Sequence, residues 1–425
     1  MLPTCTTPFV GVMPWPAGGC CSSTTWSPPG RPPRPAPANC SRPEPPRCML
    51  PQPPRRRRPT PGRPSRSGRW PWRIRDGSFP SKHVVMPDLI TLGTRGSLLA
   101  RTQTESVAKL LRDRGAEVRL EVISTRGDTS RDAPIASLGR DGVFVRELEH
   151  ALLDGRIDLA VHSCKDLPTA ETPGLVIAGM PPRANPFDAL VSAGNLPLEQ
   201  LPGGAVVGTS SVRRVAQVRR LRPDLVCRPI RGNIDTRLRK IAEGEVAAVV
   251  LAAAGLERLG MAGHVSELLR PDRFWPAVAQ GGLALQTRAD DAATIAAVIE
   301  AADDAATHRA VLAERACLAA LAGGCLAPVG AIAEELSPGQ IRLSACVLEE
   351  PAAGGVRRIV ATAERSLEVG GGKSPAEPGF MRATMQKLGR EVAGMLQAQG
   401  ADAMLAVARG QGVIDGPPRD PSSFR

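Results

Sequence analysis

Polar clusters follow four segments of this 425-residue chain that have the pattern of β-strands. The clusters are Gly93–Ser97, His162–Asp166, Thr209–Arg214 and Arg231–Arg237. Because ligands in open α/β sheets bind where the loops after the strands converge, we expect these clusters to face one cleft. Each cluster contains Arg or Lys, and guanidinium binds carboxylate or phosphate through paired hydrogen bonds. The spacing therefore predicts a cleft for a small ligand with several negative charges.

The sequence lacks the common phosphate-binding motifs, which helps to decide between phosphate and carboxylate as the anionic group of this ligand. It has neither a Gly-x-x-x-x-Gly-Lys-Ser/Thr phosphate loop nor a Gly-x-Gly-x-x-Gly turn that opens a helix. Carboxylates are therefore the favoured anions. Asp166 lies among the cations and is expected to stay ionised, either as a functional carboxylate or as a structural partner of Lys165 or of an arginine. His162 could act as a base, but a packed, hydrogen-bonded histidine is the more common outcome beside a strand.

A second chemical feature is the turn Gly323-Gly324-Cys325, which follows a helix-like segment and precedes Pro328. The glycines allow positive φ and close backbone approach, and the proline prevents the helix from resuming. This position favours a reactive or modified thiol at Cys325, whereas burial as a small hydrophobe explains Cys317 and Cys346. Because the cysteines form no C-x-x-C pair and no His-x-x-x-His accompanies them, no metal site is predicted.

The composition divides the chain in two. Residues 1–85 hold 14 basic and 2 acidic side chains, which account for the whole formal net charge of +12. The rest of the chain has equal numbers of acidic and basic side chains, which argues against a nucleic-acid partner. Residues 1–85 also hold 21 of the 42 prolines and show no helix or strand periodicity, so disorder is expected there. A dispensable tail is favoured over a targeting segment or a binding arm.

Neither membrane insertion nor secretion is indicated by the sequence. The longest apolar stretch, 246–256, is too short to span a bilayer. The N-terminus lacks the charged, apolar and small-residue series of a signal peptide. Scattered cysteines in such a chain are typical of free thiols in a reducing compartment.

Strand-like and helix-like segments alternate from residue 89 onwards. Strands are predicted at 89–94, 118–122, 157–161, 205–208, 225–230 and 246–251, with helix-length segments between them. A helix at about 307–321 precedes strand-like runs at 341–348 and 357–363 and a long helix at about 376–399. The pattern predicts an α/β fold with mainly parallel sheets, followed by a smaller α+β domain.

Several blocks in register closely resemble the porphobilinogen deaminases, also called hydroxymethylbilane synthases. The blocks run in order from about residue 90 to 335. They are ITLGTRGSLLARTQ, TRGD, GVFVRELEHALLDGRIDLAVHSCKDLPT, GTSSVRRVAQ, RGNIDTRL, AAAGLERLG, PAVAQGGLALQTR and ERACLAALAGGCLAPVG. So many blocks in the same order make the resemblance to this family specific.

The resemblance implies a fold of three domains. The first two are expected to be like type II periplasmic binding proteins, with a cleft between them, and the third is a smaller α+β domain that carries the cofactor cysteine. The expected bounds are 1–85 for a disordered extension, 86–183 with 281–303 for domain 1, 184–280 for domain 2, 304–410 for the C-terminal domain and 411–425 for a tail.

The resemblance also implies an activity. Members of the family are transferases that join four porphobilinogen molecules head to tail, with loss of ammonia from each, to give hydroxymethylbilane. Asp166 matches the catalytic aspartate, and Cys325 matches the cysteine that holds a dipyrromethane cofactor through a thioether. The positions that match other contacts to the cofactor are Arg95, Ser97, Lys165, Ser211, Arg213, Arg214, Arg231 and Arg237. The positions that match contacts to the substrate are Gln103, Phe144, Thr209, Arg258 and Gln280.

The chain departs from the family pattern at a few positions. Relatives often place lysines in the loop where this chain has Ser137 and Asp141, and an arginine where it has Ala320. Ala279 stands where glycine is usual. None of these departures removes a residue that the chemistry needs.

The alternative to an enzyme is a non-catalytic protein of the periplasmic type that binds small anions. Such a protein would share the sheets and the arginine-lined cleft, but it would need neither Asp166 nor the turn at Cys325. The enzyme interpretation predicts porphobilinogen as the partner, with no nucleic acid and no membrane, and a monomer. It predicts a cytoplasmic location, or a plastid only if residues 1–85 are a transit peptide.

Overall fold

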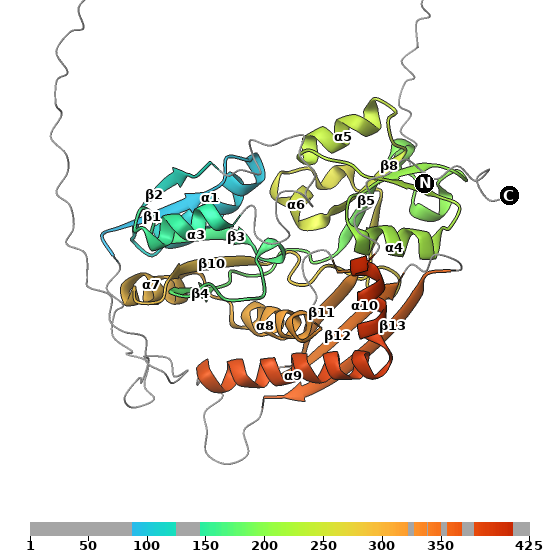
Figure 1. Ribbon diagram of the computed structural model, residues 1–425. Helices are drawn as coiled ribbons and strands as arrows, with labels where there is room; N and C mark the ends of the chain where they lie inside the picture. The colour runs from blue at the N-terminus through green and yellow to red at the C-terminus, as the bar shows by residue number, and fades with distance from the viewer. Residues whose placement is uncertain are drawn as a thin grey trace, which may run out of the picture. The chain divides into compact units, whose positions relative to one another are not determined.

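The computed structural model describes residues 87–124, 145–321, 327–337, 339–349, 355–367 and 378–410 (Figure 1). The extension 1–85 and the tail 411–425 lie outside these ranges, as do Phe144 and Cys325. The loop with Ser137 and Asp141 also lies outside them. The described residues form three β-sheets with helices packed against them.

The first sheet has five strands in the order β2-β1-β3-β10-β4. They are β1 (Leu89–Thr94), β2 (Glu117–Val122), β3 (Leu159–Ser163), β4 (Leu175–Gly179) and β10 (Leu283–Arg288). β1 is parallel to β2 and β3, whereas β10 is antiparallel to β3 and β4. Helices α1 (Leu98–Arg112) and α7 (Ala292–Ala302) share one core cluster with the sheet, and α3 (Arg146–Leu153) shares another.

The second sheet repeats this arrangement with the order β7-β6-β8-β5-β9. Its strands are β5 (Asp188–Ser192), β6 (Val206–Gly208), β7 (Val226–Arg228), β8 (Ala248–Ala252) and β9 (Glu267–Leu269). β6 is parallel to β7 and β8, whereas β5 is antiparallel to β8 and β9. Helix α4 (Val212–Leu221) packs in one core cluster, and α5 (Ile234–Ala242) and α6 (Ala253–Arg258) pack in another.

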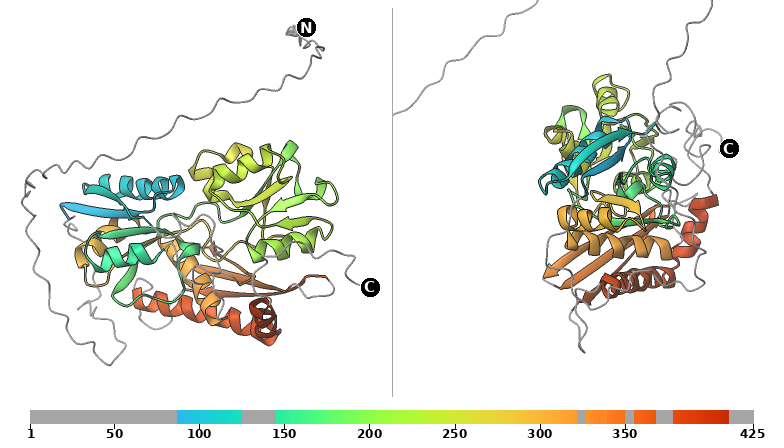
Figure 2. Two further views of the ribbon diagram at one scale, coloured as in Figure 1. Left: turned by 45° about the horizontal axis from the view of Figure 1, so that its top comes forward. Right: turned by 90° about the vertical axis from the view of Figure 1, so that its left-hand side faces the viewer.

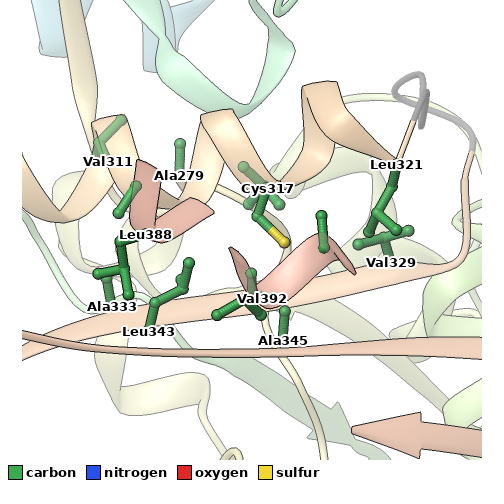
Figure 3. Packing of buried hydrophobic residues seen from close by; sticks show 14 of the residues in the cluster. Ala279, Val311, Cys317, Leu321, Val329, Ala333, Leu343, Ala345, Leu388 and Val392 are labelled. Carbon is green, nitrogen blue, oxygen red and sulfur yellow. The ribbon is translucent and has the colours of Figure 1, made fainter. Parts of the chain in front are cut away.

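The third sheet is antiparallel, in the order β11-β12-β13. It consists of β11 (Val329–Ser337), β12 (Gln340–Glu349) and β13 (Arg357–Ser366). Helices α8 (Ala305–Ala320), α9 (Pro378–Ala398) and α10 (Ala401–Gly410) accompany it, and the red α9 lies against the orange strands in Figure 2. Cys317 of α8 and Val392 of α9 meet in the core of this part (Figure 3). Gly389 allows the close approach, since a Cβ there would lie 2.6 Å from the carbonyl oxygen of Ala313.

The expected fold class is confirmed, as two α/β sheets are followed by a small antiparallel sheet with helices. The prediction of mainly parallel sheets is wrong, because β5 and β10 are antiparallel to both of their neighbours. These two strands, together with β4, β9 and β11, were missing from the sequence prediction. The segments of β4, β5, β9 and β10 are short or largely buried on both faces, so they show little alternation of polar and apolar residues. The β11 segment is 9 residues long, but its buried residues come first and its exposed residues last, so it shows no alternation either.

Glu314 of α8 joins three other segments through one fully buried carboxylate. Its Oε1 accepts hydrogen bonds from Arg183 Nη1 (2.6 Å) and from the backbone N–H of Ala333 (2.8 Å). Its Oε2 accepts from Arg183 Nη2 (3.0 Å) and from the N–H of Ala279 (2.6 Å). Arg183 and Ala279 belong to the segments by which the chain passes from the first sheet to the second and back again. Glu314 therefore ties the third sheet and its helices to both crossings.

Replacing Glu314 by Gln should lower the free energy of unfolding by about 3–5 kcal/mol, because Arg183 would keep a charge that is largely removed from water. Equilibrium denaturation would measure this change. The matched control is Glu364→Gln, which breaks the exposed pair with Arg342 and should change the value by about 0.5 kcal/mol or less. Equal effects of the two variants would contradict the role given to Glu314.

Candidate functional site

The carboxyl ends of β1 and β3 bring three sequence-predicted residues to one edge of the first sheet. Arg95 and Ser97 follow β1, and the Ser97 hydroxyl caps α1 by accepting from the N–H of Ala100 (3.3 Å). Gln103 of α1 is buried and exchanges two hydrogen bonds with Ser163, at 3.0 Å and 3.2 Å. Ser163 ends β3, so Gln103 fixes the point where the chain leaves the sheet toward Asp166.

The corresponding edge of the second sheet carries the hydroxyl cluster. Thr209 follows β6 and is almost fully buried, and its hydroxyl accepts from the N–H of Ser211 (3.3 Å). Ser211 caps α4, because its hydroxyl accepts from the N–H of Arg214. The first turn of a helix presents backbone N–H groups and a positive dipole end, which favour an anion. This edge is therefore suited to a carboxylate.

Arg213 and Arg214 are not simply exposed at the start of α4, because both are paired with Asp188. Asp188 Oδ2 lies 2.8 Å from Arg213 Nη1, and Oδ1 lies 2.6 Å from Arg214 Nη2 and 3.0 Å from its Nε. All three side chains are buried, the carboxylate completely. Burial alone would raise the pKa of Asp188, but the charges and hydrogen bonds of the two arginines hold it well below its usual value. The sequence interpretation did not identify Asp188.

The direction of β5 explains how Asp188 reaches this place. Asp188 is the first residue of β5 and pairs with Ala252, the last residue of β8. An antiparallel strand begins at the edge where its parallel neighbours end, so its first side chain joins the ligand edge. The sequence does carry one signal for this position. Asp188 is an acidic residue directly before an apolar segment, in a chain whose other strand-like segments are followed by arginines.

In the first sheet, the antiparallel strand β10 brings Gln280 to Lys165, as β5 brings Asp188 to the arginines in the second sheet. Lys165 lies in the short helical turn Cys164–Asp166 after β3, and Gln280 lies just before β10, whose Leu283 pairs with Ser163. Lys165 Nζ donates to Gln280 Oε1 (3.3 Å). The Gln280 amide nitrogen donates in turn to Asp188 Oδ1 (3.0 Å). These contacts connect the cations of α4 to the turn that carries Asp166.

The ammonium of Lys165 is destabilised by its surroundings. Burial lowers its pKa to about 8, and nearby charges have smaller effects, the carboxylates raising the pKa and the arginines lowering it. Asp166, by contrast, is exposed at the end of the same turn. The arrangement places a solvent-accessible carboxylate beside a partly buried cation, and such a pair can hold a ligand that offers both N–H donors and carboxylates.

Three more predicted arginines, Arg231, Arg237 and Arg258, lie in the segments that connect the strands of the second sheet. Arg237 Nε donates to the carbonyl oxygen of Gly232 (2.9 Å), and burial together with the charge of Arg214 lowers its pKa to about 10. Arg231 is exposed. Arg258, at the end of α6, donates to the carbonyl oxygen of Gly281 (2.7 Å) and so contacts the segment that returns to the first sheet. Arg237 thus lies within electrostatic reach of the α4 cluster, whereas Arg258 is engaged at the crossing.

Ala279 has a backbone conformation that explains why glycine is usual at this position. Its φ is +60°, in the left-handed region that costs an L-residue about 1 kcal/mol or more. The bond from its N–H to Glu314 holds the peptide in this conformation, one residue before Gln280. The strained backbone of Ala279 is therefore part of the segment that places the Gln280 side chain against Lys165.

His162 is a packed residue, as the sequence favoured. It is 5% exposed, and its Nε2 lies 3.0 Å from Gln286 Oε1, which accepts the proton of the neutral ring. Burial lowers its pKa to about 4, and the charge of Arg95 acts in the same direction. A neutral donor with this partner is not suited to act as a base at neutral pH.

A cavity of about 400 Å³ lies elsewhere, among α8, α9 and the segment after Asp166. None of the sequence-predicted site residues lines it. In the described ranges, no group of three or more His, Cys, Asp or Glu side chains is placed to hold a metal ion. No helix in the described part of the chain combines the length and apolarity needed to cross a bilayer.

His162 should make the protein sensitive to acid. Its pKa is lower in the folded than in the unfolded chain, so its contribution to stability is present above pH 6.5 and is lost as the pH falls toward about 4. The loss corresponds to about 3 kcal/mol. In His162→Gln, the free energy of unfolding should fall less between pH 7 and pH 4.5 than in the unchanged protein.

The control for this measurement is His264→Gln, which changes an exposed histidine and should keep the full acid sensitivity. Urea denaturation at several pH values gives all three curves. If His162→Gln were as sensitive to acid as the unchanged protein, the neutral state of His162 would be disproved.

Solved structures that align with the chain include ligand-binding proteins of low sequence identity. The methionine-binding protein MetQ covers 51% of this chain and 90% of its own, with 16% identity and a TM-score of 0.33. A periplasmic binding protein from Salmonella typhimurium, described as specific for arginine, covers 51% and 92%, with 13% identity and a TM-score of 0.31.

Curated relatives are much more similar. A porphobilinogen deaminase of Roseiflexus sp. strain RS-1 is 50% identical over 250 residues, which are 58% of this chain and 82% of that protein. One from Acidothermus cellulolyticus is 46% identical over 286 residues, 66% of this chain and 86% of the relative. One from Mycobacterium marinum is 53% identical over 246 residues, 58% and 77% of the two chains.

Two family models match successive parts of the chain. Residues 90–296 match the porphobilinogen deaminase dipyrromethane cofactor binding domain, and residues 308–370 match the porphobilinogen deaminase C-terminal domain. Together they span the three sheets and most of the helices described above. The resemblance found in the sequence blocks is confirmed, and the chain belongs to the porphobilinogen deaminase family.

Proposed function

We propose that this chain joins four porphobilinogen molecules head to tail and releases hydroxymethylbilane and ammonia. Porphobilinogen deaminase activity in tetrapyrrole biosynthesis follows from its family. The structural observation that carries the proposal is the exposed Asp166 beside Lys165, with Arg213 and Arg214 linked to that lysine through Gln280 and Asp188. A substrate with a pyrrole N–H and two carboxylates needs these two kinds of partner in one place.

The site residues fit a dipyrromethane, whose side chains are carboxylates. Lys165, Arg213 and Arg214 carry three positive charges, and Asp188 is the buried carboxylate among them. A positive balance remains for an anionic ligand, and the first turn of α4 adds backbone donors. The cofactor domain of the family covers these positions. We infer that Arg95, Ser97, Ser211, Arg231 and Arg237 complete the set that would hold the cofactor.

The dipyrromethane supplies the pyrrole terminus to which the first substrate is joined. We infer that Cys325 holds it through a thioether, because this thiol is the one in the family's Gly-Gly-Cys turn. The cysteines of α8 and β12 are suited to packing in the core and not to attachment of the cofactor. Cys317 and Cys346 are fully buried, and burial raises the pKa of each thiol to about 12, so they are poor nucleophiles.

Asp166 is proposed as the catalytic residue. Its carboxylate is exposed and so can accept the pyrrole N–H of an incoming substrate. The same negative charge stabilises the positive charge that develops on the substrate as ammonia leaves. Gln103, Phe144, Thr209, Arg258 and Gln280 are proposed to position that substrate.

The domain bounds are also a proposal. Residues 86–183 with 281–303 contain every strand of the first sheet, and 184–280 contain every strand of the second. The third sheet lies within 304–410. In this division, no described sheet is shared between domains.

We further infer that the enzyme works as a cytoplasmic monomer. Cys164, Cys227, Cys317 and Cys346, the cysteines within the described ranges, are free thiols, which suits a reducing compartment. The monomeric state is inferred from the family resemblance.

The attachment of the cofactor can be tested by intact-mass spectrometry. Protein purified from a host that makes porphobilinogen should carry the extra mass of two linked pyrrole units. Cys325→Ala should lack this mass, whereas Cys227→Ala, which removes another free thiol, should retain it. An unmodified wild type, or a modified Cys325→Ala variant, would refute the proposed attachment.

If Asp166 is catalytic, replacing it by asparagine should lower kcat strongly. Asp166→Asn removes the charge and keeps the size, so kcat should fall by about 100-fold or more. Thermal unfolding should stay close to that of the wild type because the side chain is exposed. Asp154→Asn, at an exposed position at the end of α3, should keep the wild-type rate. Near-normal turnover of Asp166→Asn, measured as ammonia release, would assign catalysis to another carboxylate.

A further inference from the structure

Asp188 is in contact with side chains from two other segments of the chain. Its two oxygens face Arg213 and Arg214 of α4, and Oδ1 also accepts from Gln280 Nε2 (3.0 Å). The carboxylate is fully buried, so water does not compete for these contacts. A carboxylate in this position determines where all three partners point.

We propose that Asp188 is a positioning residue for the reaction: its carboxylate orients Arg213 and Arg214 and, through Gln280, the ammonium of Lys165 toward the carboxylates of the substrate and of the growing chain. This inference rests on the proposed function, and it adds a residue that does not itself touch the ligand.

The two arginines need Asp188 because they are desolvated side by side. Besides the ion pairs, Arg213 Nη1 donates to the carbonyl oxygen of Trp275, and Arg214 Nη1 donates to that of Val250 (2.9 Å). These neutral acceptors fix one end of each guanidinium but do not balance the charge. With Asp188 present, the triad keeps one net positive charge, which is available to an anionic ligand. Without it, two buried cations would repel each other.

Asp188 also fixes which end of the Gln280 amide faces Lys165. The amide nitrogen donates to Asp188 and to the carbonyl oxygen of Pro186 (2.9 Å), both of which only accept. The amide oxygen is therefore left on the side of Lys165 and accepts from its ammonium. A side chain at 188 that can also donate would weaken this selection, which would then depend on the carbonyl oxygen of Pro186 alone.

The charges around Lys165 give the proposal a signature in the pH profile. Burial lowers the pKa of Lys165 to about 8, Arg213 and Arg214 of α4 act in the same direction, and Asp166 on its own turn and Asp188 of β5 raise it. The ammonium form is the one that binds carboxylates, so kcat/KM should fall as the pH rises through about 8. Loss of the charge of Asp188 should lower the pKa of Lys165 further and move this fall to lower pH.

The experiment compares the pH profiles of kcat/KM, by ammonia release, for the full chain with Asp188, Asp188→Asn and Asp188→Glu. Asp188→Asn should lose on the order of 100-fold in kcat/KM at neutral pH, chiefly through a raised KM, with the alkaline fall shifted downward. Asp188→Glu keeps the charge and should restore part of kcat/KM, with the fall near its original position. An Asn variant whose profile keeps its shape would overturn the proposal.

Asp158→Asn is the control, since it also neutralises a carboxylate that pairs with an arginine, in this case Arg288. The Asp158 side chain contacts Arg288 and the N–H of Thr91, and neither belongs to the segments of Lys165 or Gln280, so the alkaline fall should stay in place even if stability drops. A downward shift in Asp158→Asn of the same size would show that the shift reports general damage, and it would overturn the proposal.

Gln280→Met provides a second variant should Asp188→Asn fail to fold. It leaves the ion pairs of Asp188 intact and removes the acceptor of Lys165, so the alkaline fall should again move downward. An unmoved fall in this variant would also overturn the proposal. A wild type that releases no ammonia from porphobilinogen would instead refute the proposed function.

Discussion

The ion pairs of Asp188 with Arg213 and Arg214 set the conditions for the rest of the site. Cations that bind carboxylates are most effective away from water, where each charge interacts more strongly. Removing two guanidiniums from water is costly unless a negative charge accompanies them. One carboxylate for two guanidiniums meets this need and leaves the region positive. The neighbouring Lys165 and Arg237 add charge to the same region, and their pKa values are lowered chiefly by burial, with the charge of Arg214 acting in the same direction.

The antiparallel strands make this arrangement possible. Parallel strands can deliver to the ligand edge only the residues that follow them. β5 and β10 run the other way, so they deliver the residues at their beginnings, namely Asp188 and, just before the strand, Gln280. In each sheet an antiparallel strand thus contributes one polar side chain, the carboxylate of Asp188 in one and the amide of Gln280 in the other. These two side chains are hydrogen-bonded to each other. The topology thus supplies the partners that organise the cations.

The sequence predicts well those features that depend on local pattern. The strand ends with Arg95, Lys165 and Arg213 could be located because each follows a short apolar run and precedes a helix start. Asp188 could not be assigned in this way, because its partners lie 25 residues or more further along the chain and depend on the direction of β5. The packed state of His162 was the favoured expectation, whereas its partner Gln286 belongs to β10 and could not be anticipated.

The two sheets differ in one respect that concerns the order of synthesis. All strands of the second sheet lie between residues 188 and 269, whereas the first sheet needs β10, at residues 283–288, to pair with both β3 and β4. On the ribosome the chain emerges from its N-terminus, and parts that are complete can fold first. The second sheet is therefore the first that can be completed, although it begins later in the chain. Until β10 emerges, β4 has no partner strand within the described sheets, and unpaired backbone N–H and C=O groups of a strand favour pairing with other chains.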